Sequence, residues 1–370
     1  ITTDGLYKRL YDTLLTLDKL ERYRGHFFNW YDIESLRVLQ HYVSTVDSGN
    51  LLACLLTLGK GLLEYQNDEP RLKEISERCL KLASEMDFSF LYNDNKKLFV
   101  IGYNHETGLP DKNFYDLYSS EMKITSFITV ALGKVPREHW KKLARPMLKK
   151  DRFYGLASWS GTMFEYLMPA LFLKTVEGSL DYESIQFAIY CQKKAVSDIP
   201  WGISESAYSS FDDRLNYQYK AFGVKSTAFA KESHERVVVS PYSSLLTLPF
   251  CARAAVNNLK RIERLGGRGR YGFYEALDFG RAGDLDSMQR VLCYMSHHIG
   301  MGFLACTNFL KDNIMQQRLF SIPRIRAFEY MLEQRVAYNP VVVKEDGPMR
   351  DRPQALLAFG HQRRRLPAGF

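Results

Sequence analysis

The sequence has few of the features that mark membrane, secreted or metal-binding proteins. Its 370 residues contain no apolar run near the roughly 20 that a transmembrane helix needs, and no signal-type start. The six cysteines are widely spaced and lack a C-x-x-C pair, which indicates buried, reduced thiols and a cytoplasmic protein. Because no His, Cys and Asp cluster has metal-ligand spacing, we expect neither a metal ion nor another cofactor.

Nucleotide and nucleic-acid motifs are also missing. The formal charge is +8, but residues from 344 onward contribute strongly, with six Lys and Arg against three Asp and Glu. No basic stripe interleaves with aromatics, so we do not expect a nucleic-acid partner. The Gly-rich segment 266–270 lacks the G-x-x-x-x-G-K-[ST] motif and is predicted to be a turn. No G-x-S-x-G elbow is present either.

Aromatic residues are abundant, at 14%, and three clusters combine them with an acid. The main one is the stretch 200–208, Pro-Trp-Gly-Ile-Ser-Glu-Ser-Ala-Tyr, and the others lie at 155–166 and 271–275. Aromatic faces bind sugar rings and a carboxyl transfers a proton, so this composition is typical of a sugar-cleaving site. The candidates are Trp159, Glu165, Trp201, Glu205, Tyr208, Tyr274 and Glu275.

Two N-terminal segments add further candidates. The loop 25–32 is rich in rings and polar groups, which predicts ligand contacts by Trp30, Tyr31 and Asp32; a loop packed under its own aromatics is the alternative. A helix is predicted to begin within 44–50. There Asp47 is either an N-cap, as Ser48 could be, or a ligand contact.

Glu121 is the strongest acid outside the aromatic clusters. The apolar positions Leu117 and Ile124 predict a helix whose inward stripe passes through Glu121. A carboxylate there costs free energy unless it is used or paired with an Arg. Asp116 is a weaker candidate, because an N-cap at Asn113 would place it at the ordinary N3 position.

Two further patterns have local explanations. Glu165 stands three residues after Thr162, the spacing of a capping box, so its role is open between capping and ligand binding. The adjacent His297 and His298 are expected to point to different sides of a helix, which does not make an i, i+4 zinc pair.

The hydrophobic pattern predicts an all-α protein. Apolar residues recur three and four apart through most of the chain, and they give about a dozen helices. Clear examples are residues 6–23, 71–86, 136–147, 160–173, 182–194, 243–265 and 288–301. Short extended pieces are predicted at 99–104 and 237–239. No low-complexity linker divides the chain, which favours one large domain.

Several long motifs, in order, resemble the central glycoamylase-like domain of cyclic β-1,2-glucan synthases. They lie at 21–32, 42–50, 159–169, 200–208, 271–278 and 295–301, and the resemblance covers roughly residues 5 to 335. Residues 115–121 resemble the family's Tyr-Asp-Leu-x-x-Ser-Glu, and residues 202–206 its Gly-Ile-Ser-Glu-Ser. The segments 295–301 and 224–226 depart from the family pattern, which puts acceptor preference in doubt more than chemistry.

This resemblance implies an (α/α)6 barrel over residues 1–340. It does not extend beyond about residue 344, and residues 341–370 are expected to be a disordered or vector-derived tail. It implies action on linear β-1,2-glucan, by retaining transglycosylation within a larger synthase that has flanking domains and is membrane-bound. Endo-β-1,2-glucanase activity or an inactive glucan-binding barrel are the alternatives. The expected catalytic residues are Glu121 and Glu205. The expected substrate contacts are Trp30, Tyr31, Asp32, Asp47, Asp116, Trp159, Glu165, Trp201, Tyr208, Tyr274, Glu275 and His297.

Overall fold

The protein divides into two compact units in a computed structural model that describes residues 2–230, 236–336 and 342–343. Unit 1 comprises Ile1–Ala144, Phe172–Lys174 and Asn313–Glu333. Unit 2 comprises Arg145–Leu171, Thr175–Asp312 and Gln334–Phe370. The chain therefore passes between the units several times, and the single domain over 1–340 stays a prediction. The predicted tail at 341–370 lies outside the described residues, apart from 342–343.

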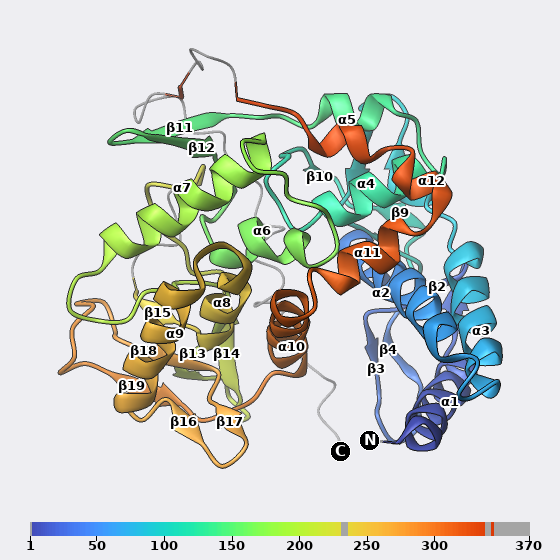
Figure 1. Ribbon diagram of the computed structural model, residues 1–370, viewed down its shortest axis with the longest axis horizontal. Helices are drawn as coiled ribbons and strands as arrows, with labels where there is room; N and C mark the ends of the chain where they lie inside the picture. The colour runs from blue at the N-terminus through green and yellow to red at the C-terminus, as the bar shows by residue number, and fades with distance from the viewer. Residues whose placement is uncertain (1, 231–235, 337–341, 344–370) are drawn as a thin grey trace. The chain divides into compact units, whose positions relative to one another are not determined.

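Unit 1 is built on the long helix α2, which packs against α3, α4 and α11 (Figure 1). Residues Leu72, Ile75, Cys79 and Leu82 of α3 are buried, as their spacing of three and four predicts. The helices are α1 (Thr3–Lys19), α2 (Thr45–Leu62), α3 (Arg71–Glu85), α4 (Lys123–Ala131), α5 (Glu138–Lys142), α11 (Ile314–Phe320) and α12 (Pro323–Arg326), with 3₁₀ turns at Leu63–Tyr65, Ser89–Leu91 and Glu329–Leu332.

Short antiparallel ladders connect the helices of unit 1. Two are pairs: β1 (Arg22–Tyr23) with β2 (His26–Phe27), and β3 (Trp30–Tyr31) with β4 (Val38–Gln40). Two have three strands: β5 (Tyr42–Ser44), β8 (Gly102–Asn104) and β9 (Leu109–Pro110), and β6 (Tyr92–Asn93), β7 (Leu98–Val100) and β10 (Phe114–Tyr115).

Unit 2 combines helices with a sheet region around the turn 200–206. Its helices are α6 (Met163–Leu167), α7 (Leu180–Ala195), α8 (Pro241–Leu246), α9 (Leu248–Arg264) and α10 (Ser296–Leu310), with a 3₁₀ turn at Met168–Leu171. Its ladders are β11 (Met147–Lys150) with β12 (Phe153–Leu156), β13 (Ser206–Phe211) with β14 (Tyr217–Lys220), β16 (Arg268–Gly269) with β17 (Gly272–Phe273), and the sheet of β15 (Val238–Val239), β18 (Ala276–Asp278) and β19 (Gln289–Val291). Phe187, Phe222 and Phe279 are buried in its hydrophobic core.

The prediction of an all-α protein is confirmed in part: the described chain is rich in helix, but both units also contain short antiparallel strands. The helices predicted at 71–86 and 182–194 are confirmed, whereas those at 136–147 and 288–301 are shortened to α5 and to the first turns of α10. The segment 266–270 enters the β16–β17 hairpin. All six cysteines are free, yet Cys54 is exposed, against the expectation of burial.

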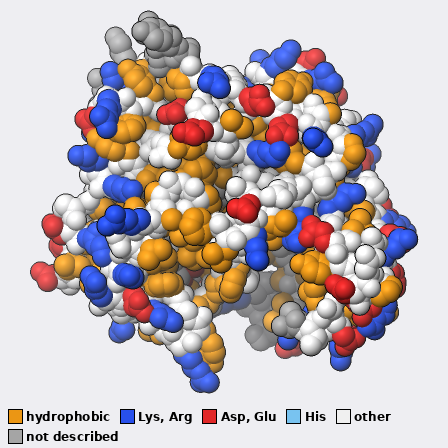
Figure 2. All heavy atoms as spheres, in the orientation of Figure 1, with side chains coloured by type: hydrophobic (Ala, Val, Ile, Leu, Met, Phe, Trp, Pro, Cys, Tyr) orange, Lys and Arg blue, Asp and Glu red, His pale blue; other side chains and the backbone are white. Residues whose placement is uncertain are grey.

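The last observations concern the charge of the surface, membrane-spanning helices and metal ligands. Figure 2 shows basic and acidic side chains interspersed over the visible face. Within the described ranges, no helix is long and apolar enough to cross a bilayer, and no three His, Cys, Asp or Glu side chains are grouped closely enough to hold a metal ion.

Candidate active site

Glu205 lies on a tight turn that leads into β13. Gly202 adopts a φ of +119°, and a Cβ at this position would lie 2.4 Å from the Ser243 Oγ, so the turn requires glycine. The Gly202 carbonyl accepts from the Ser240 N–H at 3.0 Å and from the Ser243 hydroxyl at 3.1 Å. These bonds tie the turn to the start of α8 and fix the backbone that carries Glu205.

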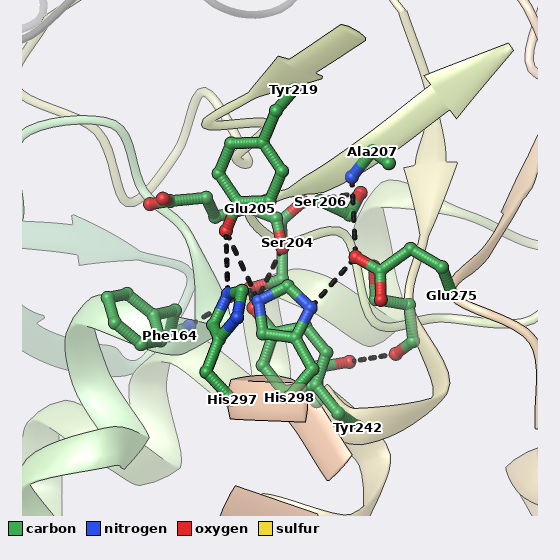
Figure 3. Close-up of polar contacts among 12 residues, drawn as sticks. Phe164, Ser204, Glu205, Ser206, Ala207, Tyr219, Tyr242, Glu275, His297 and His298 are labelled. Carbon is green, nitrogen blue, oxygen red and sulfur yellow. Dashed lines mark hydrogen bonds and ion pairs between the residues drawn. The ribbon is translucent and has the colours of Figure 1, made fainter. Parts of the chain in front are cut away.

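Tyr242, on α8, holds the backbone of Glu205 directly. Its hydroxyl donates to the Glu205 carbonyl oxygen at 2.9 Å, and it accepts from the Ser204 hydroxyl at 2.8 Å. The Ser204 Oγ in turn accepts from the Phe164 N–H of α6 at 3.0 Å (Figure 3). Hydrogen bonds thus join two helices to the turn, which makes its position well defined.

Glu275 and His298 form a buried pair next to this turn. Both side chains are 2% exposed, and the His298 Nδ1 lies 2.8 Å from the Glu275 Oε1. The same carboxylate oxygen accepts from the Ala207 N–H at 3.3 Å. The His298 Nε2 lies 3.2 Å from the Tyr219 Oη, so the pair reaches toward Glu205 through a tyrosine (Figure 3). Such burial does not favour the predicted contact of Glu275 with substrate.

The two tyrosines of the site are held in their neutral form. Burial raises the pKa of Tyr219 well above its usual value, and the negative charges of Glu205 and Glu275, with a hydrogen bond to Glu205, raise it further. Burial also raises the pKa of Tyr242, although the hydrogen bond from Ser204 acts in the opposite direction. Both hydroxyls are therefore hydrogen-bond donors at neutral pH.

Glu165 is engaged by its own loop. The Thr162 hydroxyl accepts from the Glu165 N–H at 3.1 Å, and the Glu165 carboxylate accepts from the Thr162 N–H at 3.0 Å, which confirms the predicted capping box of α6. This carboxylate also accepts from the Ser158 hydroxyl and the Trp159 N–H, each at 2.9 Å. Its hydrogen bonds therefore hold the loop 158–162 in shape.

The aromatic candidates of unit 2 differ in exposure. Trp159 and Trp201 are buried, at 7% and 6% exposure. Tyr208 and Tyr274 are half-buried, and the Tyr208 hydroxyl donates to the Gln218 side chain at 2.6 Å. Sugar stacking on these rings stays a prediction, and the half-buried tyrosines are better placed for it than the tryptophans.

The structure corrects the local setting of Glu121, which belongs to unit 1. Because Phe114–Tyr115 forms β10 and α4 begins at Lys123, Glu121 precedes the helix and does not interrupt its apolar face. Its side chain is half-buried, and the Ser120 hydroxyl donates to its carboxylate at 3.3 Å. The predicted position on a helical stripe is wrong, while the catalytic role stays a prediction.

Asp47 and Asp116 also differ from their predicted settings. Ser44 is the N-cap of α2, not Asp47 or Ser48, and its hydroxyl accepts from the Asp47 N–H at 3.3 Å. The Asp47 side chain is exposed, and its carboxylate accepts from the Asn29 amide at 2.9 Å. Asp116 follows a strand, so its predicted N3 position in a helix is wrong. Asp47 therefore remains accessible to a ligand.

In the aromatic loop 25–32, before α2, some side chains make structural contacts and others are exposed to solvent. The Tyr31 hydroxyl donates to the Glu21 carbonyl at 2.7 Å, and the Asp32 carboxylate accepts from the Ser35 N–H at 2.7 Å. Hydrogen bonds from Ser35 hold the pKa of Asp32 below its usual value. Trp30 is 42% exposed and presents its ring to solvent, as a sugar-binding side chain would.

Sequence reasoning missed Tyr219, Tyr242 and His298. The prediction that His297 and His298 point apart is wrong, because their Nε2 atoms lie 3.4 Å and 3.2 Å from the same Tyr219 hydroxyl. The alternation of Tyr217 and Tyr219 with polar residues is a strand pattern that could have placed Tyr219 on one face of β14. No local pattern signals its contacts with distant α10.

Comparison with solved structures defines the class of fold. The chain matches an endo-β-1,2-glucanase from Chitinophaga pinensis, in complex with sophorotriose and glucose, with a TM-score of 0.67 at 16% identity, over 90% of this chain and 82% of that one. It matches an endo-β-1,2-glucanase from Talaromyces funiculosus, in complex with sophorose, with a TM-score of 0.66 at 12% identity, over 92% and 76%. The protein shares the fold of these structures.

The chain belongs to the Glycoamylase family, described as "Putative glucoamylase", whose model matches residues 113–323, more than half of its length. The cyclic β-(1,2)-glucan synthase NdvB of Rhizobium meliloti (strain 1021) is 32% identical over 369 residues. That match covers 89% of this chain and 13% of NdvB, so the chain corresponds to a small part of the relative's length.

Proposed function

We propose that the protein is an enzyme that cleaves and re-forms β-1,2-glucosidic bonds of linear β-1,2-glucan. The observation that carries the proposal is the setting of Glu205, a half-buried acid on a rigid turn, next to a tyrosine backed by a buried Glu275–His298 pair. Glycoside cleavage requires a carboxyl that is held in place and whose surroundings control its proton. The 32% identity to NdvB supports β-1,2-glucan as the substrate.

The proposed mechanism uses Glu121 and Glu205 as the two carboxyls and retains the anomeric configuration. One carboxyl forms a covalent glycosyl-enzyme while the other protonates the leaving oxygen. A sugar hydroxyl then attacks the intermediate, either from another glucan or from the distant end of the same chain, which gives a ring. The aromatic candidates Trp30, Tyr208 and Tyr274 would bind the acceptor sugar.

The fold and the cellular location that we propose also follow from the similarity to the endo-β-1,2-glucanases and to NdvB. Residues 1–340 form one catalytic (α/α)6 barrel, supported by the fold shared with the endo-β-1,2-glucanases. We also propose that the barrel works in the cytoplasm as one domain of a larger, membrane-bound synthase. The small share of NdvB that the chain matches supports the larger size alone.

Hydrolysis is the second candidate, because the solved structures that share the fold include endo-β-1,2-glucanases from two organisms. In that case water attacks in place of the acceptor sugar. Both candidates need the same two glutamates, so substitution of these residues tests the shared proposal before the products distinguish the two.

The test is turnover of linear β-1,2-glucan by Glu121→Gln and Glu205→Gln, with exposed Glu177→Gln as the matched control. Each catalytic variant should lose about 100-fold or more in kcat, since a positioned acid or base contributes at least that much. Melting temperatures should stay close to that of the wild type. Near-normal turnover by Glu205→Gln would remove the proposal, and a wild type without activity would favour the inactive glucan-binding barrel.

A further inference from the structure

Four side chains from separate elements of unit 2 form a continuous chain of polar contacts. Glu275 precedes β18, His298 lies in the first turn of α10, Tyr219 lies on β14, and Glu205 precedes β13 (Figure 3). The links are Glu275 Oε1 to His298 Nδ1 at 2.8 Å and His298 Nε2 to Tyr219 Oη at 3.2 Å. The last link is the hydrogen bond between the side chains of Tyr219 and Glu205.

The donor and acceptor roles in this chain follow from elementary chemistry. A carboxylate only accepts, so the His298 Nδ1 carries a proton toward Glu275. If His298 is neutral, its Nε2 accepts the Tyr219 hydroxyl proton. If His298 is protonated, its Nε2–H donates to the Tyr219 oxygen, and the Tyr219 proton is then directed to Glu205. Because a carboxylate can only accept, the hydrogen bond between Tyr219 and Glu205 directs the Tyr219 proton to Glu205.

We propose that Tyr219 is a positioning residue for Glu205, which it holds ionised and in one orientation by donating a hydrogen bond that the Glu275–His298 pair enforces. This inference rests on the proposed catalytic role of Glu205. It assigns a use to the Glu275–His298 pair, whose side chains are each only 2% exposed.

The neighbours of the chain restrict its geometry and its charge. The Tyr242 ring stacks on the His298 ring at 3.9 Å between centroids, with an interplanar angle of 15°. The titratable groups that face Tyr219 and His298 are Glu205, Glu275, Tyr242 and His297, and Cys293 lies next to Glu275. Burial raises the pKa of Cys293 to about 11, so this thiol is neutral and Glu205 and Glu275 supply the negative charge.

The experiment compares pH profiles of kcat on linear β-1,2-glucan for the wild type and Tyr219→Phe. A donated hydrogen bond favours the ionised carboxylate, so its removal raises the pKa of Glu205. The limb of the profile that Glu205 governs should therefore move to higher pH by about one unit. The value of kcat should fall by about 100-fold, as for loss of one aligned donor. The matched control is Tyr217→Phe, on the same strand, whose hydroxyl accepts from the Leu292 N–H.

The second variant, Glu275→Gln, keeps the shape and the acceptor oxygen but removes the charge. It should move the same limb in the same direction, because a neutral amide is a weaker acceptor for the His298 Nδ1–H, and His298 then holds the Tyr219 hydroxyl less firmly. If Tyr219→Phe does not fold, the Glu275→Gln variant still tests the positioning role of Tyr219. The inference is overturned if the folded variants keep the wild-type profile while Glu205→Gln is inactive. An active Glu205→Gln variant would instead refute the proposed function, and the inference with it.

Discussion

At the scale of single residues, hydrogen bonding separates the acids of unit 2 by role. Glu275 is buried against His298 and the Ala207 N–H, and the Glu165 carboxylate is engaged by its own loop. Glu205 is half-buried; Tyr242 is bonded to its backbone carbonyl, and Tyr219 is hydrogen-bonded to its side chain. Of the three, Glu205 is therefore the acid best placed to reach a sugar.

Glu165→Gln should mainly lower stability. An amide nitrogen in place of one carboxylate oxygen would face the N–H groups of the loop 158–162, and a buried donor without its acceptor costs about 1–3 kcal/mol. We expect a lower melting temperature with turnover reduced far less than in Glu205→Gln, and no change in either property for the exposed control Glu177→Gln. A Glu165→Gln variant that melts like the wild type would contradict this account of the loop.

Two buried histidines of unit 1 should make stability depend on pH. Burial lowers the pKa of His26 and of His139 from 6.5 to about 4. As the pH falls below 6.5 the unfolded chain binds protons before the folded one, so the free energy of unfolding falls between pH 6.5 and 4, by up to roughly 3 kcal/mol per histidine. Melting temperatures measured across this range test the slope, which His139→Gln should reduce.

A residue's role could be predicted when its partners lie close to it in the sequence, and could not when they lie far away. The capping box of Thr162 and Glu165 lies within one turn, so its spacing was sufficient to predict it. Glu121 was misplaced because an apolar spacing of three and four also occurs in the irregular segment before α4. The contacts of Tyr219 with Glu205 and His298 were unpredictable, because tertiary folding alone brings them together.

At the scale of elements, the close approach of α2 and α4 in unit 1 depends on Gly49. A Cβ at this position would lie 1.7 Å from the Thr125 Oγ1, far inside any allowed contact. Gly49→Ala should therefore force the helices apart and destabilise the protein by about 1–3 kcal/mol. The control is Gly300→Ala in α10, where a Cβ meets no atom within 4 Å and should be neutral or stabilising. Equal melting temperatures for the two variants would contradict this packing.

Long helices were predictable from the sequence, and most strands were not. In α3 the buried residues Leu72, Ile75, Cys79 and Leu82 recur at helical spacing, which is enough to define the helix. Most ladders have strands of two or three residues, such as Trp30–Tyr31 in β3, and a period of two cannot be recognised over so short a length. Their pairing is set by tertiary contacts, so an all-α protein was predicted in their place.

At the scale of the whole molecule, the proposed reaction needs two carboxyls, which we assign to Glu121 and Glu205. A retaining enzyme holds its two carboxyls roughly 5 Å apart, whereas an inverting one needs roughly 6.5–9.5 Å to admit water. We predict retention, so the product formed first should keep the β configuration. Proton NMR of the anomeric signals during the first minutes of reaction tests this, and an α product would indicate inversion.

The most direct test of the central claim is incubation of the protein with linear β-1,2-glucan, followed by chain-length analysis and a reducing-end assay on the same samples. Because a sugar hydroxyl, not water, is proposed to attack the intermediate, chain lengths should redistribute and cyclic products should form with little rise in reducing ends. The Glu205→Gln variant should leave the glucan unchanged. A steady climb in reducing ends without cyclic products would contradict transglycosylation and establish a glucanase, and an unchanged glucan with the wild type would contradict the enzymatic function itself.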